Sequence, residues 1–200
     1  MKLAILDLGI GNLHSLAKAY AAAGADVSVT TNIVKATSAE LLALPGVGAF
    51  SAASASLGES GRVAVRAALA GGLPCIGVCL GMQLLFESSE EGDGAGLSVF
   101  EGHVVRLACK RTPHMGWSRL DAVAPSPAPR ALPLPTAVYY AHSFACAPRD
   151  PSLVVATSTV EGVNFPAIVQ RARVVGCQFH PEKSSRPGLA LLAALVEAVR

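Results

Sequence analysis

The sequence carries almost no net charge, because 16 lysine and arginine residues are nearly balanced by 14 aspartate and glutamate residues, which leaves a formal charge of +2. Nucleic-acid-binding domains commonly present a strongly basic face, so this balance argues against DNA or RNA as a partner. No stretch reaches the roughly 18 to 20 apolar residues of a membrane-spanning helix. Asp7 and Gly9 also interrupt the apolar start too early for a secretory signal. We therefore expect neither a nucleic-acid partner nor a membrane association.

Cysteine is scarce as well, with five residues in an odd number and no regular spacing. This argues against a disulfide framework and favours free thiols in a reducing compartment, so a cytoplasmic protein is expected. Cys75 and Cys79 have a spacing that zinc ligands can adopt, but no second ligand pair stands nearby. We expect no metal and no cofactor.

A hydrophobic content of 52% over 200 residues suits one compact domain spanning 1–200. Short apolar runs at 2–7, 27–30, 41–44 and 75–78 read as buried strands, with helical stretches before Gly24 and at 62–70. Parallel pairing with crossover helices follows from this alternation. The sequence thus predicts an α/β fold with three layers and a mostly parallel sheet.

The second half of the chain changes to β-rich segments, which we expect as antiparallel additions to the sheet. The proline-rich stretch 124–135 predicts a surface loop. The last predicted element is a helix that buries one side, formed by Leu189, Leu192, Leu195, Val196 and Val199. The predicted β segments are 97–100, 104–108, 138–141, 153–157, 167–170 and 174–179.

Cys79 has the strongest chemical signature in the chain. It follows the apolar strand 75–78, is flanked by Gly77 and Gly81, and leads directly into a helical pattern. A glycine-flanked strand-to-helix turn of this type is a nucleophile elbow, which projects a reactive side chain over the start of the helix. A buried core cysteine is the ordinary alternative, but the flanking glycines favour a nucleophile.

A base for this thiol is available in His180, which ends another apolar run and is followed two residues later by Glu182. We expect Cys79, His180 and Glu182 to form a triad that hydrolyses an amide through a thioester. The oxyanion of that reaction needs backbone donors, and the loop 45–48 can reach the elbow because loops at the carboxyl ends of parallel strands gather at one edge. The amides of Val47 and Leu80 are the predicted donors.

Other motifs are weaker. The run from Gly9 to Asn12 follows a strand but lacks the third glycine of a dinucleotide-binding loop, so Asn12 more plausibly caps a helix. His114 and His142 are interpreted as satisfied polar residues in packed loops rather than catalysts.

The elbow run VCLGMQ at 78–83 together with the HPE run at 180–182 resembles the triad (class I) glutamine amidotransferases. Four stretches further resemble the glutaminase subunits of imidazole glycerol phosphate synthase, and the similarity spans the whole chain. These stretches are LDLGIGNL at 6–13, PGVGAF at 45–50, PHMGW at 113–117 and HPEKS at 180–184. The resemblance implies a flavodoxin-like three-layer fold and the hydrolysis of L-glutamine.

The resemblance also implies a heterodimer in which ammonia passes to a separate (β/α)8-barrel cyclase subunit of histidine biosynthesis, which makes imidazole glycerol phosphate and AICAR. By position it implies two further sets of residues. Those that hold glutamine would be Gly48, Gln83, Glu91, Ser143 and Phe144, and those toward the cyclase would be Asn12, Tyr139 and Lys183.

Two alternatives remain open at this stage. One is the glutaminase subunit of anthranilate or aminodeoxychorismate synthase, since the elbow and the His-x-Glu pair are common to several amidotransferases. The other is a non-catalytic module that only activates the barrel subunit.

Overall fold

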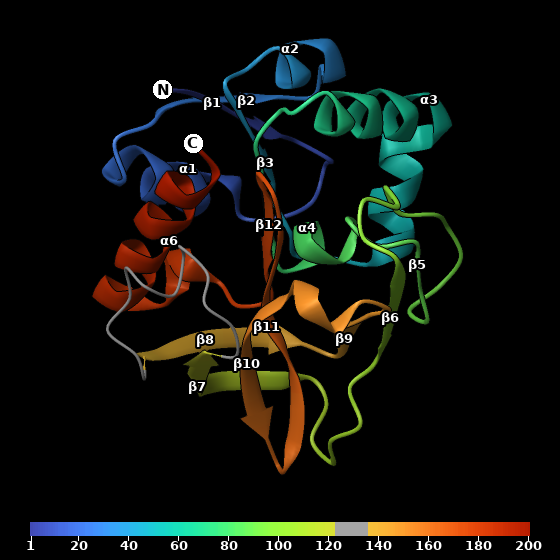
Figure 1. Ribbon diagram of the computed structural model, residues 1–200, viewed down its shortest axis with the longest axis vertical. Coiled ribbons are helices and arrows are strands. Elements are labelled where there is room, and N and C mark those ends of the chain that lie inside the picture. The colour runs from blue at the N-terminus through green and yellow to red at the C-terminus, as the bar shows by residue number, and fades with distance from the viewer. Residues whose placement is uncertain (123–135) are drawn as a thin grey trace.

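The computed structural model of the protein describes residues 1–122 and 136–200, and a nine-stranded mixed sheet runs through its centre (Figure 1). In spatial order the strands are β2 (Asp26–Thr30), β1 (Lys2–Leu6), β3 (Leu41–Leu44), β4 (Cys75–Val78), β12 (Val174–Cys177), β11 (Val163–Arg171), β10 (Val154–Val160), β7 (His114–Ala122) and β8 (Thr136–His142).

The sheet changes character at β12. From β2 to β12 each neighbouring pair is parallel, and from β12 to β8 each pair is antiparallel. A separate three-stranded sheet contains β5 (Ser88–Ser89), β6 (Gly102–Arg106) and β9 (Phe144–Pro148). The predicted α/β class, with a parallel first half and antiparallel strands later, is confirmed.

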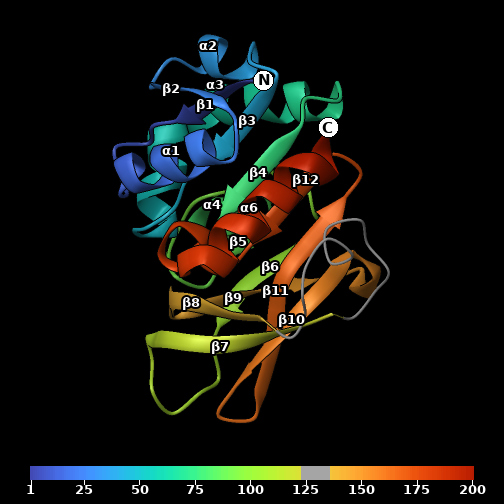
Figure 2. The same cartoon turned by 90° about the vertical axis from the view of Figure 1, so that its left-hand side faces the viewer.

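Helices cover both faces of the parallel part, and each face has its own hydrophobic cluster (Figure 2). One cluster includes Tyr20 of α1 (Leu13–Ala22) and Leu192 of α6 (Ser185–Val199), both fully buried. The opposite cluster includes Phe50, from α3 (Phe50–Ala70), and residues of α2 (Ile33–Thr37) and α4 (Leu80–Gln83). Each fully buried large side chain contributes about 1.5–3 kcal/mol, so these clusters fix the three layers. The described residues also contain two short 3-10 turns, η1 (Pro151–Leu153) and η2 (Pro181–Lys183).

The strand order decides where chemistry can occur. β4 lies between β3 and β12, and all three run in the same direction. Their carboxyl ends therefore meet at one edge of the sheet, which brings together the loop after Leu44, the turn at Cys79 and the segment after Cys177.

Several sequence predictions were wrong in detail. The helix predicted at 62–70 is longer than expected, since α3 begins at Phe50. Its first part was missed because Gly58, with a backbone φ of 61°, interrupts the helical periodicity. Residues 97–100 form no strand, and Ser98 there has a φ of 50°. The segment predicted at 104–108 is β6, which pairs with β5 and β9 instead of extending the main sheet. The loop predicted at 124–135 lies outside the described residues.

The last helix is also rotated relative to its predicted buried side. Leu189 is 38% exposed, whereas Leu191, which was not predicted, is fully buried. The other predicted positions, Leu192, Leu195, Val196 and Val199, are buried. In the part of the chain that the structure describes, no helix combines the length and apolarity needed to cross a bilayer.

Candidate active site

Cys79 lies directly after β4 in a strained backbone conformation, with φ 51° and ψ −105°. Its side chain is a free thiol and the residue is 5% exposed. Both flanking glycines are required sterically: a methyl group on Gly81 would overlap the Leu44 carbonyl, and one on Gly77 would lie 2.6 Å from the Gly81 oxygen. The turn is therefore packed tightly against the end of β3, which gives the nucleophile-elbow geometry predicted for this residue.

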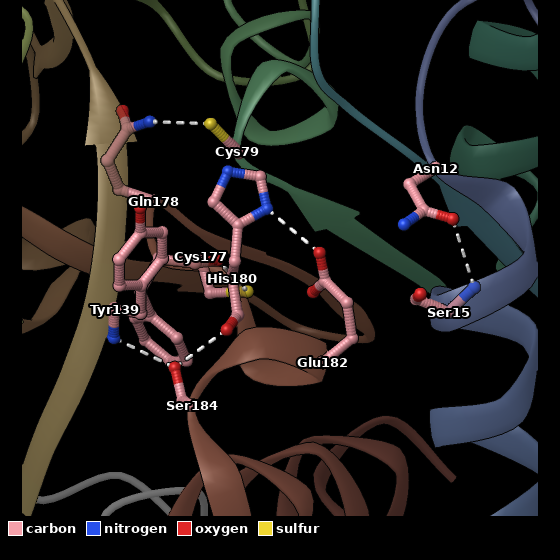
Figure 3. Close-up of polar contacts among 10 residues, drawn as sticks. Asn12, Ser15, Cys79, Tyr139, Cys177, Gln178, His180, Glu182 and Ser184 are labelled. Carbon is pink, nitrogen blue, oxygen red and sulfur yellow. Dashed lines mark hydrogen bonds and ion pairs between the residues drawn. The ribbon is translucent and has the colours of Figure 1, made fainter. Parts of the chain in front are cut away.

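His180 and Glu182 form a buried pair beside this elbow (Figure 3). The imidazole Nδ1 lies 3.0 Å from the Glu182 Oε1, and the two side chains are 1% and 6% exposed. Burial by itself would lower the pKa of His180, but its contacts with Cys79 and Glu182 outweigh burial and raise the pKa to about 9. The pair thus favours a protonated imidazole next to the thiol.

The second ring nitrogen of His180 is directed toward the Cys79 sulfur in Figure 3. Within the described residues this Nε2 has no partner that satisfies hydrogen-bond geometry, although the sulfur is close enough to raise the pKa of the ring. The sulfur therefore acts on the ring at short range and favours its charged form. Catalytic hydrogen bonds are often long in unliganded sites and shorten when substrate binds.

The backbone around His180 is held by β8 and by Ser184. His180 N–H donates to the Tyr139 carbonyl at 2.9 Å. The Ser184 hydroxyl accepts from the Tyr139 N–H at 2.8 Å and donates to the His180 carbonyl at 2.6 Å. Ser184 ends the HPEKS run, but its role could not be predicted from the sequence, because that role depends on β8, which lies beside it.

Gln178 is a second residue that sequence analysis missed. Its Nε2 donates to the Cys79 sulfur at 3.4 Å, and its Oε1 accepts from the Gln83 Nε2 at 3.3 Å. The Gln83 Nε2 also lies 3.1 Å from the Phe144 carbonyl. Gln178 stands two residues before His180, so period-2 alternation of side chains in an extended segment could have pointed to it.

A pocket of about 170 Å³ opens in front of the thiol. This is smaller than the roughly 300–1,000 Å³ that drug-sized ligands occupy, and it suits a ligand of amino-acid size. His180 and Glu182 do not line it and lie behind the sulfur, next to a smaller cavity. The pocket is lined by Val47, Gly48, Cys79, Leu80, Gln83, Glu91, Pro113, Ala141, His142, Ser143 and Phe144.

The structure thus brings together both predicted oxyanion residues and all five residues implied for glutamine binding. Val47 and Leu80 are adjacent because Gly46 packs on the elbow: a methyl group there would lie 2.5 Å from the Leu80 nitrogen. Glu91 does not stand free in the pocket, since its Oε2 accepts a hydrogen bond from the Phe50 N–H at 2.7 Å. That contact joins the pocket wall to the first residue of α3.

His114 and His142 lie in strands, not in the predicted loops, and face each other across β7 and β8. His142 lines the pocket, its Nδ1 is 2.8 Å from the Phe144 carbonyl, and burial lowers its pKa to about 4. It is therefore a neutral side chain at physiological pH. His114 is hydrogen-bonded to Ser118 at 3.0 Å, as expected for a satisfied polar residue.

The three residues implied for a partner surface come from three different elements, unlike the glutamine-binding residues, which line one pocket. Asn12 caps α1, its Oδ1 accepting from the Ser15 N–H at 3.3 Å. Tyr139 packs edge-to-face on Trp117 with ring centroids 6.1 Å apart, and Lys183 is exposed in η2. Among the described residues, no three His, Cys, Asp or Glu side chains are grouped so that they could hold a metal ion.

Comparisons with known proteins agree on one family. Residues 4–197 match the family described as glutamine amidotransferase class-I. The imidazole glycerol phosphate synthase subunit HisH of Moorella thermoacetica is 44% identical over 201 residues, covering 99% of this chain and 95% of that protein. The subunit HisH of Thermosynechococcus vestitus is 42% identical, covering 99% of this chain and 97% of its own length.

Solved structures share the fold at lower identity. The structure of PurLQS from Thermotoga maritima aligns with a TM-score of 0.78 at 18% identity, over 100% of this chain and 99% of that one. A crystal structure of a glutamine amidotransferase aligns with a TM-score of 0.75 at 20% identity, over 96% and 98% of the two chains.

Proposed function

The chain belongs to the class-I glutamine amidotransferases, and we propose that it is the glutaminase subunit of an imidazole glycerol phosphate synthase, acting as one domain in the cytoplasm. The observation that carries the proposal is the alignment of thiol, imidazole and carboxylate beside an amino-acid-sized pocket, in a chain 44% identical to a HisH subunit.

The reaction begins when the Cys79 thiolate attacks the carboxamide carbon of glutamine, which forms a C–S bond and places a negative charge on the carbonyl oxygen. The N–H groups of Val47 and Leu80 stabilise this oxyanion. His180 then donates its proton to the nitrogen, the C–N bond breaks, and ammonia leaves a glutamyl thioester behind.

In the second half, His180 takes a proton from a water molecule that attacks the thioester carbon. The C–S bond breaks, glutamate leaves, and the thiolate is restored. Glu182 holds the imidazole tautomer with its proton on Nδ1 and stabilises the positive charge that forms on the ring. Its 3.0 Å contact and its side-chain exposure of only 6% suit this role, because few water molecules compete for the carboxylate.

Glutamine is held in the pocket at its amino-acid end by Gln83 and Glu91, with Gly48, Ser143 and Phe144 beside it. Gln178 supports the thiolate by donating an N–H to the sulfur at 3.4 Å. His142 is a neutral wall of the same pocket.

Ammonia is soon protonated in neutral water and then ceases to be a nucleophile, so the product must pass directly to an acceptor site. We assign that site to a (β/α)8-barrel cyclase subunit that docks on the β7 and β8 side, with Asn12, Tyr139 and Lys183 in the contact. Two apolar side chains on β7 support this surface, since Met115 is 65% exposed and Trp117 is 52% exposed. Exposed aromatic residues and methionine are enriched at protein interfaces.

The test is a glutaminase assay of the purified chain, alone and with the barrel cyclase and its nucleotide substrate. We expect glutamate formation that depends on Cys79 and increases with the liganded cyclase. A Cys79→Ala chain that still supports glutamine-dependent turnover would contradict the triad. Pairing with a chorismate-using subunit in place of the cyclase would assign the chain to anthranilate or aminodeoxychorismate synthesis instead.

A further inference from the structure

We propose that Asn12 is a positioning residue for Glu182, acting through one water molecule that bridges the Asn12 Nδ2 and the Glu182 Oε2. The inference builds on the proposed glutaminase function. It adds a hydrogen bond on the far side of the catalytic pair, between α1 and the carboxylate.

The first observation is a buried oxygen without a partner. The Glu182 side chain is 6% exposed, and its Oε1 is engaged by His180. Its Oε2 is buried and makes no hydrogen bond within the residues that the structure describes. A buried carboxylate oxygen left unpaired is costly, so this atom points to a hydrogen-bond donor other than those that the described residues place against it.

The second observation is a cavity of the right size beside that oxygen. It leaves about 10 Å³ for the centre of a water-sized sphere, close to the roughly 10–15 Å³ that one water requires. A buried water also needs at least two polar partners, so a second polar side chain besides Glu182 must lie on the wall of the cavity. The wall is formed by Asn12, Leu16, Pro45, Gly46, Val47, Val78, His180 and Glu182.

Asn12 supplies that side chain in a defined orientation. Because its Oδ1 accepts from the Ser15 N–H at 3.3 Å, the amide must present Nδ2 on its other side. Figure 3 shows this nitrogen directed toward the side on which Glu182 lies. A water in the cavity can accept from Nδ2 and donate to the Glu182 Oε2.

The bridge restrains the carboxylate at both oxygens, so that Oε1 stays in line with the His180 Nδ1. The same cavity borders residues 45–47 of the oxyanion loop. One water thus contacts the walls formed by three elements of the site: α1, the catalytic carboxylate and the oxyanion loop.

The experiment separates this role from helix capping. Asn12→Ser keeps a capping oxygen, which serine provides nearly as well as asparagine, but its side chain is too short to carry a donor into the cavity. Asn32 provides a matched control, because its Oδ1 caps α2 by accepting from the Lys35 N–H at 3.0 Å, away from the site. Asn32→Ser therefore reproduces the capping change alone.

Two rates are measured on the free chain, so that partner contacts cannot contribute. We expect Asn12→Ser to lower kcat for glutamine about tenfold with KM within about twofold, which corresponds to loss of a hydrogen bond to a charged group. Alkylation of Cys79 by iodoacetamide at neutral pH should slow by a similar factor. Asn32→Ser should leave both rates unchanged, and the two variants should have equal melting temperatures.

The alkylation rate does not depend on glutamine, so it tests Asn12 even if the chain proves not to be a glutaminase. A high-resolution crystal structure should show a water within hydrogen-bond distance of Asn12 Nδ2 and Glu182 Oε2. The proposal is overturned if either rate is unchanged in Asn12→Ser, if Asn32→Ser lowers the rates equally, or if no water occupies that position.

Discussion

Replacing Gly46 by alanine should separate oxyanion stabilisation from formation of the thiolate. Gly46 has no positive φ, so alanine can adopt its backbone conformation and the effect is purely steric. The added methyl group would lie 2.5 Å from the Leu80 nitrogen and 2.6 Å from the Gly81 nitrogen. Carbon contacts normally begin near 3.5 Å, so the loop 45–48 must move away from the elbow by about 1 Å.

A displacement of this size is large for catalysis and moderate for stability. A misplacement of about 1 Å can cost about 100-fold in rate, and the loss of one oxyanion donor costs about 100- to 1,000-fold. We therefore expect kcat for glutamine to fall about 100-fold in Gly46→Ala. Overpacking should lower the free energy of unfolding by about 1–3 kcal/mol.

The assay compares glutamate formation with alkylation of Cys79 by iodoacetamide. Alkylation should stay within about threefold of the wild-type rate, because the contacts between sulfur, imidazole and Gln178 do not involve the loop. Gly61→Ala is the matched control: its methyl group would lie 2.6 Å from the Ile33 Cδ1, the free end of a side chain that can rotate away. If Gly46→Ala keeps kcat within about threefold of wild type, the assignment of Val47 as an oxyanion donor is wrong.

Three further variants test other parts of the site. Ser184→Ala removes the hydrogen bonds of 2.8 and 2.6 Å that join Tyr139 to His180. Urea denaturation should therefore show a free energy of unfolding that is lower by about 1–3 kcal/mol, and a decrease below about 0.5 kcal/mol would count against this role. Gln178→Leu removes the N–H donor to the Cys79 sulfur, and iodoacetamide alkylation should slow about tenfold; an unchanged rate would show that the thiolate does not need it. The pKa of His142 is lowered to about 4 by burial, so as the pH falls below 6.5 the unfolded chain gains a proton there that the folded chain does not bind. Between pH 6.5 and 4, urea titrations should therefore show the free energy of unfolding of the wild-type chain falling by up to about 3 kcal/mol more than that of His142→Gln. If the two free energies fall in parallel with pH, this linkage is refuted.

The features that the sequence revealed by itself are those that depend on neighbouring residues. The apolar runs at β1, β3 and β4 were predicted nearly to their ends, because a buried parallel strand is a short continuous hydrophobic segment. The elbow at Cys79 could be identified because its strained turn requires glycine on both sides, within five residues. His180 and Glu182 likewise stand two residues apart, so their contact needs only a local turn.

Where local patterns were ambiguous, the prediction failed. The first part of α3 was not predicted, because the helix is interrupted at Gly58 and its apolar residues therefore do not follow one continuous helical period. The segment at β6 was predicted to join the main sheet, because periodicity shows only which face of a strand is apolar and not which sheet it joins. β9 was not predicted as a strand. His114 and His142 were placed in loops because each stands at the end of a strand: β7 begins at His114, and β8 ends at His142, one residue beyond the strand predicted at 138–141.

The amino-acid sequence alone determined which groups are chemically capable, because a thiol, an imidazole and a carboxylate in these local settings have few other interpretations. Tertiary structure decided that they meet: Cys79 and His180 stand about a hundred positions apart, and only the parallel pairing of β4 with β12 brings their strand ends together. The same packing recruited Gln178 and Ser184 and left the small cavity between Asn12 and Glu182. Those contacts depend on strand order and on the volumes of facing side chains, which no single segment of the chain encodes.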